Sequence, residues 1–217
     1  MNLERLRQFL VELSFNNSKP WFDKNRDRYQ ALRLEFIDYV HRAIQEISGF
    51  DASVKNVEAK SCLYRINRDV RFSNNKNPYK TNFSAAICAG GRHSSDPIYY
   101  LHVSGEGESV AAGGIWLPEA SQLAEIRTFI AANQKRADKL LFDPKLLKFF
   151  GGLDIEHKLM RFPKNFPEGS DLLKLKSFTV SKNYDAFEHD ANSLLEEFIS
   201  SFEKMQPLIQ FLRETRV

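Results

Sequence analysis

The sequence has little cysteine, with two among 217 residues. Two thiols are too few for a disulfide framework, which favours a reduced protein. No run approaches the ~20 apolar residues that a transmembrane helix needs. The charged start of the chain, residues 1–7, also lacks the apolar stretch of a signal peptide. We therefore expect a cytoplasmic protein without a membrane partner.

Motifs that hold cofactors, metals or nucleophiles are also missing. The sequence contains no Walker loop, no G-x-G-x-x-G and no G-x-S-x-G. It has no H-E-x-x-H and no paired C-x-x-C, so we predict neither a metal site nor a cofactor. The net charge of +3 is too small to indicate a nucleic-acid partner by itself. These absences name no reaction, and enzymatic activity stays an open alternative.

Hydrophobic periodicity divides the chain into three parts. Residues 1–50 repeat apolar side chains at helical spacing. Residues 57–117 contain alternating stretches, as at 83–87 and 99–103, separated by turns typical of hairpins. Residues 118–217 are again mainly helical. We predict a single α+β domain over residues 1–217, with a central antiparallel sheet of about four to six strands flanked by N-terminal and C-terminal helices.

Local signals indicate where several elements begin, bend or end. Asn2 is expected to cap the first helix, and Asp143, which precedes a proline, to begin a short later helix. Pro207 is expected to kink or break the C-terminal helical region. The two glycines at 113–114 indicate a bulge or a close backbone contact, and residues 176–181 an edge strand.

One segment, residues 60–80, carries the basic character of the protein. Its charged residues are Lys60, Arg65, Arg68, Asp69, Arg71, Lys76 and Lys80. Apolar and polar side chains alternate over residues 61–73, which predicts an extended strand with one buried face. Arg68 falls on the apolar face, where a guanidinium needs a carboxylate, backbone carbonyls or a bound anion.

The turn that follows brings further cations back to the arginines. Residues 74–78 are rich in Asn and end in Pro, which is typical of a turn. A cluster of this kind suits a phosphate or a carboxylate, so we predict an anionic small molecule as the partner. The candidate ligand-binding residues are Arg65, Arg68, Arg71, Lys76 and Lys80. Asp69 and Tyr79 are candidate catalytic groups, as a base and a hydrogen-bond donor.

Two other interpretations of this segment stay open. In the first, Arg68 and Asp69 only pin the sheet to the helices, and the protein is structural or mediates an interaction. In the second, which we favour least, the protein binds nucleic acid. The side chains of Tyr64, Phe72 or Tyr79 would then stack on bases.

The basic segment also resembles a known family. The pattern Arg65-x-x-Arg68-Asp69-x-Arg71-Phe72-x-x-Asn75-Lys76-x-x-Tyr79 resembles the signature of the domain of unknown function 2461 family, whose members are mostly bacterial. Further stretches that resemble motifs of this family are residues 16–22, 113–118, 161–164 and 175–178. Ala112 and Asn165 depart from its pattern, because glycine is common at both places. The resemblance implies no activity, cofactor or partner.

Overall fold

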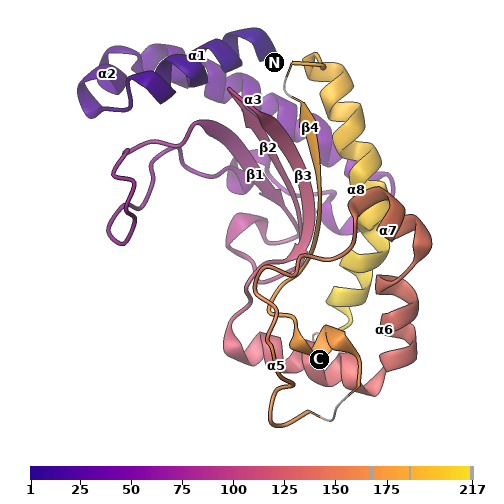
Figure 1. Ribbon diagram of the computed structural model, residues 1–217. Helices are drawn as coiled ribbons and strands as arrows, with labels where there is room; N and C mark the ends of the chain where they lie inside the picture. The colour runs from indigo at the N-terminus through magenta and orange to yellow at the C-terminus, as the bar shows by residue number, and fades with distance from the viewer. Residues whose placement is uncertain (167–168, 186, 216–217) are drawn as a thin grey trace.

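A four-stranded antiparallel sheet, in the order β1-β2-β3-β4, lies at the centre of the computed structural model (Figure 1). The structure describes residues 1–166, 169–185 and 187–215. The strands are β1 (Asn82–Ile87), β2 (Ile98–Ser104), β3 (Glu108–Ile115) and β4 (Phe178–Asp185). The first three follow one another through hairpins, whereas β4 returns from the C-terminal part of the chain to pair with β3.

Helices precede and follow the sheet, which confirms the predicted single α+β domain. The helices are α1 (Leu3–Phe15), α2 (Lys19–Lys24), α3 (Arg26–Ser48), α4 (Ala59–Cys62), α5 (Ala120–Ala132), α6 (Gln134–Leu141), α7 (Pro144–Phe150) and α8 (Ala191–Arg213). Short 3-10 turns are η1 (Ala52–Val54), η2 (Gly91–His93) and η3 (Asp171–Lys174). Within the described part of the chain, no helix is apolar over a length that would cross a bilayer.

The long helix α8 covers one face of the sheet (Figure 1). Alternation along β2 directs Tyr99 toward α8, where its ring meets Phe202 at 5.4 Å between centroids. Gly113 of β3 allows the helix to come this close, because an added Cβ would lie 2.2 Å from the sulfur of Met205. Tyr100 points to the other face of the sheet, which is the face that α8 leaves uncovered.

Several predicted element ends are confirmed. The side chain of Asn2 accepts a hydrogen bond from the backbone of Arg5 and caps α1. Asp143 accepts from the amides of Lys145 and Leu146 and caps α7. Residues 178–185 form the edge strand β4, which begins two residues after the start of the predicted stretch, 176–181.

Two expectations about secondary structure are wrong. Residues 57–81 were predicted as part of the sheet, but they contain α4 and then an irregular excursion before β1 begins. Pro207 was expected to kink or break the C-terminal helix, and the break is wrong, since α8 runs through it from Ala191 to Arg213. Proline removes one backbone donor, and the buried side chains of Met205 and Leu208 on either side hold the helix against the sheet.

Candidate functional site

The chain between α4 and β1 projects from the body of the protein as an irregular hairpin (Figure 1). We call residues 63–81 the arm. An isolated bridge between Asn67 and Tyr79 joins its two sides, and a second, between Leu63 and Ala85, joins its start to β1. The predicted strand over residues 61–73 with one buried face is therefore wrong, and Phe72 is 96% exposed. On the apolar side Cys62 and Ile66 are buried, Val70 is half-buried and Phe72 is exposed, so the alternation leads to burial at the base of the arm and not at its tip.

Arg68 holds the tip of the arm together. Its guanidinium donates to the carbonyl oxygens of Asn75 at 3.3 Å and Asn77 at 3.0 Å. A third hydrogen bond, of 3.2 Å, reaches the hydroxyl of Ser73. A guanidinium on an apolar face was expected to need a carboxylate, backbone carbonyls or a bound anion, and Arg68 has backbone carbonyls. In the structure Arg68 positions the loop at the tip of the arm.

The other charged groups of the tip also bond within the arm. Asp69 accepts hydrogen bonds from the Nε and Nη2 atoms of Arg71 at 3.0 and 2.6 Å, and this side-chain bonding lowers the pKa of Asp69. The ammonium of Lys76 donates to the carbonyl oxygen of Val70 at 3.1 Å. All three charged side chains are exposed. Asp69 orients Arg71, and a catalytic role for Asp69 stays a prediction.

Tyr79 anchors the arm to the N-terminal helices. Its buried ring stacks on Phe22, with 4.1 Å between centroids and 14° between the planes. Asn17 clamps the backbone of Tyr79, because its Oδ1 accepts from the amide and its Nδ2 donates to the carbonyl, both at 3.0 Å. The sequence placed Asn17 and Tyr79 in motifs, but the contact between them, 62 residues apart, was not foreseen.

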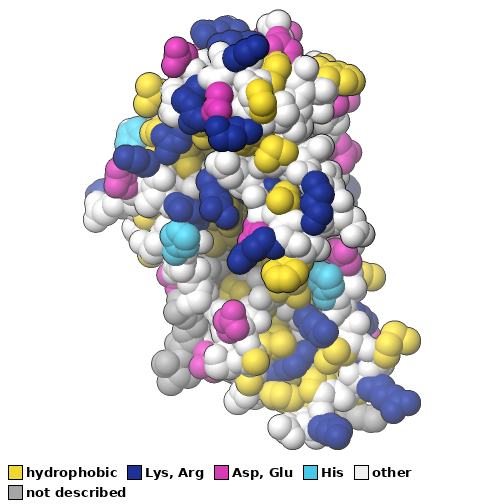
Figure 2. All heavy atoms as spheres, turned by 90° about the vertical axis from the view of Figure 1, so that its left-hand side faces the viewer, with side chains coloured by type: hydrophobic (Ala, Val, Ile, Leu, Met, Phe, Trp, Pro, Cys, Tyr) yellow, Lys and Arg dark blue, Asp and Glu magenta, His cyan; other side chains and the backbone are white. Residues whose placement is uncertain are grey.

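A pocket opens at the base of the arm, on the sheet face that α8 leaves uncovered. Its volume is about 490 Å³. Figure 2 shows this face of the molecule hollowed near its middle, with basic side chains beside the hollow. We call it the sheet-face pocket. Its lining includes Tyr64, Lys80, Asn82, Ser84, Tyr100, Trp116, Asp154, Thr179 and Ser181.

Lys80 is the candidate ligand-binding residue that the structure places in this pocket. Its side chain is half-buried, and its Nζ lies 5.0 Å from the ring centroid of Tyr64. Burial lowers the pKa of Lys80, and the positive charge of Arg65 lowers it further. Among the described residues neither Lys80 nor Arg65 forms an ion pair within 4.0 Å. Two neighbouring cations thus lack a close acid.

Asp154 is the acidic residue of the lining. Its Oδ1 accepts a hydrogen bond from the amide of Glu156 at 2.8 Å, and its own amide donates to the carbonyl of Thr179 at 2.9 Å. This second bond ties the loop after α7 to the beginning of β4. The carboxylate of Asp154 therefore orders the pocket wall without pairing with Lys80.

Tyr100 is held in place by a neutral histidine. The hydroxyl of Tyr100 lies 3.3 Å from Nδ1 of His102, and Nε2 of His102 lies 3.2 Å from the carbonyl oxygen of Glu108. A carbonyl only accepts, so Nε2 carries the proton and Nδ1 accepts from the Tyr100 hydroxyl. Burial lowers the pKa of His102, which keeps the ring neutral at pH 7.

Aromatic residues form much of the wall. Trp116, which follows β3, is 51% exposed and meets His157 edge-on, with 5.4 Å between ring centroids. From the sequence Trp116 was expected to lie in the core, with a pocket wall as the alternative, and Tyr100 was not among the candidate site residues. Trp116 lies in the 113–118 motif, which was the available signal for it. Tyr100 carried no local signal beyond its place in an alternating strand.

The described lining of this pocket includes neither Cys62 nor a cluster of metal-binding side chains. Burial raises the pKa of Cys62 to about 11, so its thiol stays protonated at pH 7 and is a poor nucleophile. Across residues 1–166, 169–185 and 187–215, no three His, Cys, Asp or Glu side chains come together as a metal site would require. The arrangement instead offers a cationic group, aromatic walls and hydroxyls.

Comparison with known proteins identifies a family without assigning an activity. A family model described as "Conserved hypothetical protein (DUF2461)" matches residues 5–211 of the chain. No curated protein matches the sequence. The matched region includes the arm, the sheet and most of α8, so all the residues of the site described above lie inside it.

Proposed function

Because the chain belongs to the conserved hypothetical protein family DUF2461, whose description names no activity, we propose a function from the site itself. The sheet-face pocket binds a small ligand that carries a phosphate or a carboxylate. Lys80 binds the anionic group, with Arg65 beside it. The aromatic side chains of Tyr64, Tyr100 and Trp116 contact an apolar part of the same ligand.

The observation that carries this proposal is the unpaired ammonium of Lys80. Two unit charges ~6 Å apart repel by roughly 3 kcal/mol at an effective dielectric constant of ~20. Burial also disfavours the charged ammonium, because it removes water from around the charge. Burial and the charge of Arg65 therefore both lower the pKa of Lys80. An anion between the two cations would offset their repulsion and raise the pKa of Lys80 by its opposite charge. The site therefore gains more from an anionic ligand than from a neutral one.

The pocket also has the size and composition of a small-molecule site. Its volume of about 490 Å³ lies within the range of roughly 300–1,000 Å³ that is usual for such sites. Aromatic walls with a few fixed polar groups are typical of pockets that bind a planar ligand. We expect a phosphate or carboxylate attached to a ring to bind better than the inorganic anion.

The five predicted ligand-binding residues take two different roles in this proposal. Lys80 and Arg65 supply charge at the base of the arm. Arg68, Arg71 and Lys76 form the hydrogen bonds that shape the tip. The structural interpretation of the basic segment thus applies to the tip of the arm, and the ligand interpretation to its base.

Thermal unfolding with inorganic phosphate, pyrophosphate and adenosine monophosphate tests the proposal. At ten times the dissociation constant, a ligand adds about 1.4 kcal/mol to the free energy of unfolding. For a domain of this size that raises Tm by about 3–5 °C. We expect Lys80→Met to remove the shift while leaving Tm without ligand unchanged or higher. The control Lys135→Met, on exposed α6, should keep the shift.

Either of two results would contradict the proposal. In the first, none of the three anions at 10 mM changes the Tm of the folded wild-type protein. In the second, the anions stabilise the Lys80→Met variant as much as the wild type and the Lys135→Met control. The second result would mean that the anions bind elsewhere on the molecule.

Single-stranded nucleic acid is a second candidate partner, and one observation favours it. Phe72 is 96% exposed at the tip of the arm, and the guanidinium carbon of Arg71 lies 5.8 Å from its ring centroid. An exposed ring beside a cation is suited to stacking on a base. Binding of labelled oligo-dT that weakens with salt and with Phe72→Ala would support it, and no retention at 50 mM salt would exclude it.

A further inference from the structure

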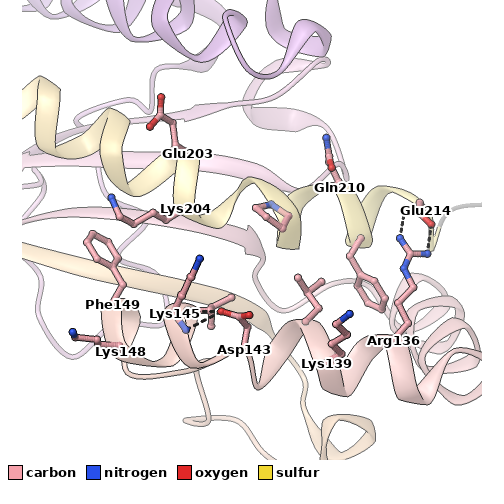
Figure 3. A pocket seen from close by; sticks show the side chains of 14 residues that line it. Arg136, Lys139, Asp143, Lys145, Lys148, Phe149, Glu203, Lys204, Gln210 and Glu214 are labelled. Carbon is pink, nitrogen blue, oxygen red and sulfur yellow. Dashed lines mark hydrogen bonds and ion pairs between the residues drawn. The ribbon is translucent and has the colours of Figure 1, made fainter.

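A groove with no part in the proposed function lies on the other side of the protein, between two helical walls (Figure 3). Helices α6 and α7 form one wall, and the C-terminal half of α8 forms the other. The volume of the groove is about 900 Å³. Because α8 covers the sheet face opposite the sheet-face pocket, the two cavities are separated by the sheet.

The floor of the groove is apolar. Leu146 and Phe211 are buried at its base, and Leu140 and Pro207 lie beside them. Pro207 has no backbone N–H, so at this residue α8 presents a hydrocarbon ring without a hydrogen-bond donor. A floor of this kind favours an aliphatic ligand, because burial of each methylene group is favourable by ~0.8 kcal/mol.

One end of the groove is cationic. Lys145, Lys148 and Lys204 surround Phe149 there (Figure 3). The Nζ atoms of Lys204 and Lys182 lie 4.5 and 5.3 Å from the centroid of the Phe149 ring. None of these four lysines has an ion-pair partner within 4.0 Å in the described part of the chain.

The acidic residues of the groove do not neutralise this end. Glu214 binds Arg136 through two hydrogen bonds of 2.6 Å at the opposite end. Asp143 accepts from the amides of Lys145 and Leu146 and caps α7. The carboxylate of Glu203 points away from Phe149 on the other side of α8 (Figure 3). The cations without an ion pair in the described part of the chain are therefore Lys145, Lys148 and Lys204 around Phe149, and Lys139 nearer the opposite end. Three of these four lysines lie at the Phe149 end.

From this arrangement we infer that the groove binds a single-chain amphiphile with an anionic head, such as a long-chain fatty acid anion. The carboxylate lies among Lys145, Lys148 and Lys204, and the chain lies along Leu140 and Leu146 toward the end where Arg136 pairs with Glu214. The volume is within the small-molecule range. A docked protein helix, about 10 Å across with its side chains, would need a longer trough than the two short helices α6 and α7 provide.

Isothermal titration with dodecanoate below its micelle concentration tests this inference. We expect one site, with affinity rising two- to fourfold for each added methylene from decanoate to tetradecanoate. Dodecyltrimethylammonium, which has the same chain and the opposite charge, should bind at least tenfold more weakly. Lys204→Glu and Lys145→Glu should each weaken dodecanoate at least tenfold, since each places a like charge at the head.

Matched controls separate this site from the sheet-face pocket. Lys135→Glu changes an exposed lysine of α6 that does not line the groove, and it should bind dodecanoate like the wild type. Lys80→Met should also leave dodecanoate binding unchanged. If Lys80→Met weakened dodecanoate as much as Lys204→Glu does, the chain would occupy the sheet-face pocket, and this inference alone would be overturned.

Three further results would overturn the inference. The first is equal binding of the anionic and cationic amphiphiles, which would show an unselective apolar surface. The second is dodecanoate binding that Lys204→Glu and Lys145→Glu leave unchanged in variants that retain the wild-type Tm. The third is a pair of results in which dodecanoate does not bind and an acidic amphipathic peptide, titrated separately, binds tightly. The groove would then be a protein-docking surface.

Discussion

Gly114 lies where β3 passes directly against the edge strand β4. Its φ of +122° is one that other residues rarely adopt. An added Cβ would lie 1.9 Å from the carbonyl oxygen of Phe178, which is backbone and does not move aside as a side chain would. Glycine at 114 therefore lets the last strand pair just before the chain reaches Trp116 in the sheet-face pocket.

We expect Gly114→Ala to destabilise the protein by about 3 kcal/mol or more, because backbone strain and a backbone clash combine. The matched control is Gly107→Ala, in the β2–β3 turn. Its φ is also positive, at +73°, but nothing lies within 4 Å of an added Cβ. It should cost about 1 kcal/mol. Urea unfolding of both variants measures the difference, and equal losses would contradict the clash.

The arm is the structural element whose role differs most from the expectation. It was predicted to be a strand of the core, and it is a projecting hairpin with its own hydrogen-bond system. Arg68, Asp69, Arg71 and Lys76 all bond to groups of the arm itself. The arm thus has local stability of its own, and its base carries Lys80 into the sheet-face pocket.

Replacing Arg68 with Ala should loosen the arm without unfolding the protein. Hydrogen bonds from a charged donor contribute ~1.5–3 kcal/mol each, but the partners here are exposed and water can replace the lost donors. We expect faster amide exchange over residues 66–80 and a change in global unfolding free energy of about 1 kcal/mol. The control Phe72→Ala changes an exposed side chain, so it should alter neither the amide exchange of the arm nor the global unfolding free energy. A global loss as large as ~4 kcal/mol for Arg68→Ala would contradict this, since it would require a buried ionic contact.

The arm is attached to the N-terminal helices through two hydrogen bonds between Asn17 and the backbone of Tyr79. Asn17→Ala removes both hydrogen bonds to the half-buried backbone of Tyr79. We expect a loss of about 2–3 kcal/mol, measured by urea unfolding. Asn16→Ala is the matched control, because the Asn16 side chain donates only to Glu12 at the end of α1. A surface change of that kind should stay within about 0.5 kcal/mol. Equal effects of the two substitutions would show that the clamp contributes nothing.

At the scale of the whole molecule, Asp51 joins three distant parts of the chain. It follows α3, and its buried carboxylate accepts two hydrogen bonds from Arg213 of α8 at 3.0 and 2.7 Å. The hydroxyl of Tyr99 on β2 donates a third, at 2.9 Å. Burial by itself raises the pKa of Asp51, but the hydrogen bonds from Arg213, Ser53 and Tyr99 outweigh it and lower the pKa to about 2.

This carboxylate predicts an acid-sensitive component of stability. The folded pKa of about 2 is below the unfolded value of 3.8. The group therefore stabilises the fold above pH ~4, and the effect disappears as the pH falls toward ~2. We expect Asp51→Asn to cost about 2 kcal/mol at pH 7. The gap in unfolding free energy between this variant and the wild type should narrow below pH ~3. A gap that is constant from pH 7 to 2.5 would contradict this assignment.

The basic segment illustrates how far the sequence predicts the site. Its charge and its motif pointed to the stretch of chain that forms the arm, and they named Lys80, which the structure places in the lining of the sheet-face pocket. They did not separate Lys80, which enters a pocket, from Arg68, which bonds to its own loop. That separation depends on where the chain bends after Asn67, and alternation of side chains does not encode a bend. Tyr100 and Trp116 join the site from β2 and the end of β3.

The sequence by itself determined the local features of this protein: the helices with their caps, the hairpins of the sheet and the family to which it belongs. These depend on backbone preferences and side-chain spacing within a few residues. Only the tertiary structure decided that β4 pairs with β3, that α8 continues through Pro207, and that Lys80 lies over the ring of Tyr64 in the sheet-face pocket. Each of these depends on contacts between residues far apart in the chain, whose energies are set by burial and by the charges that meet in space.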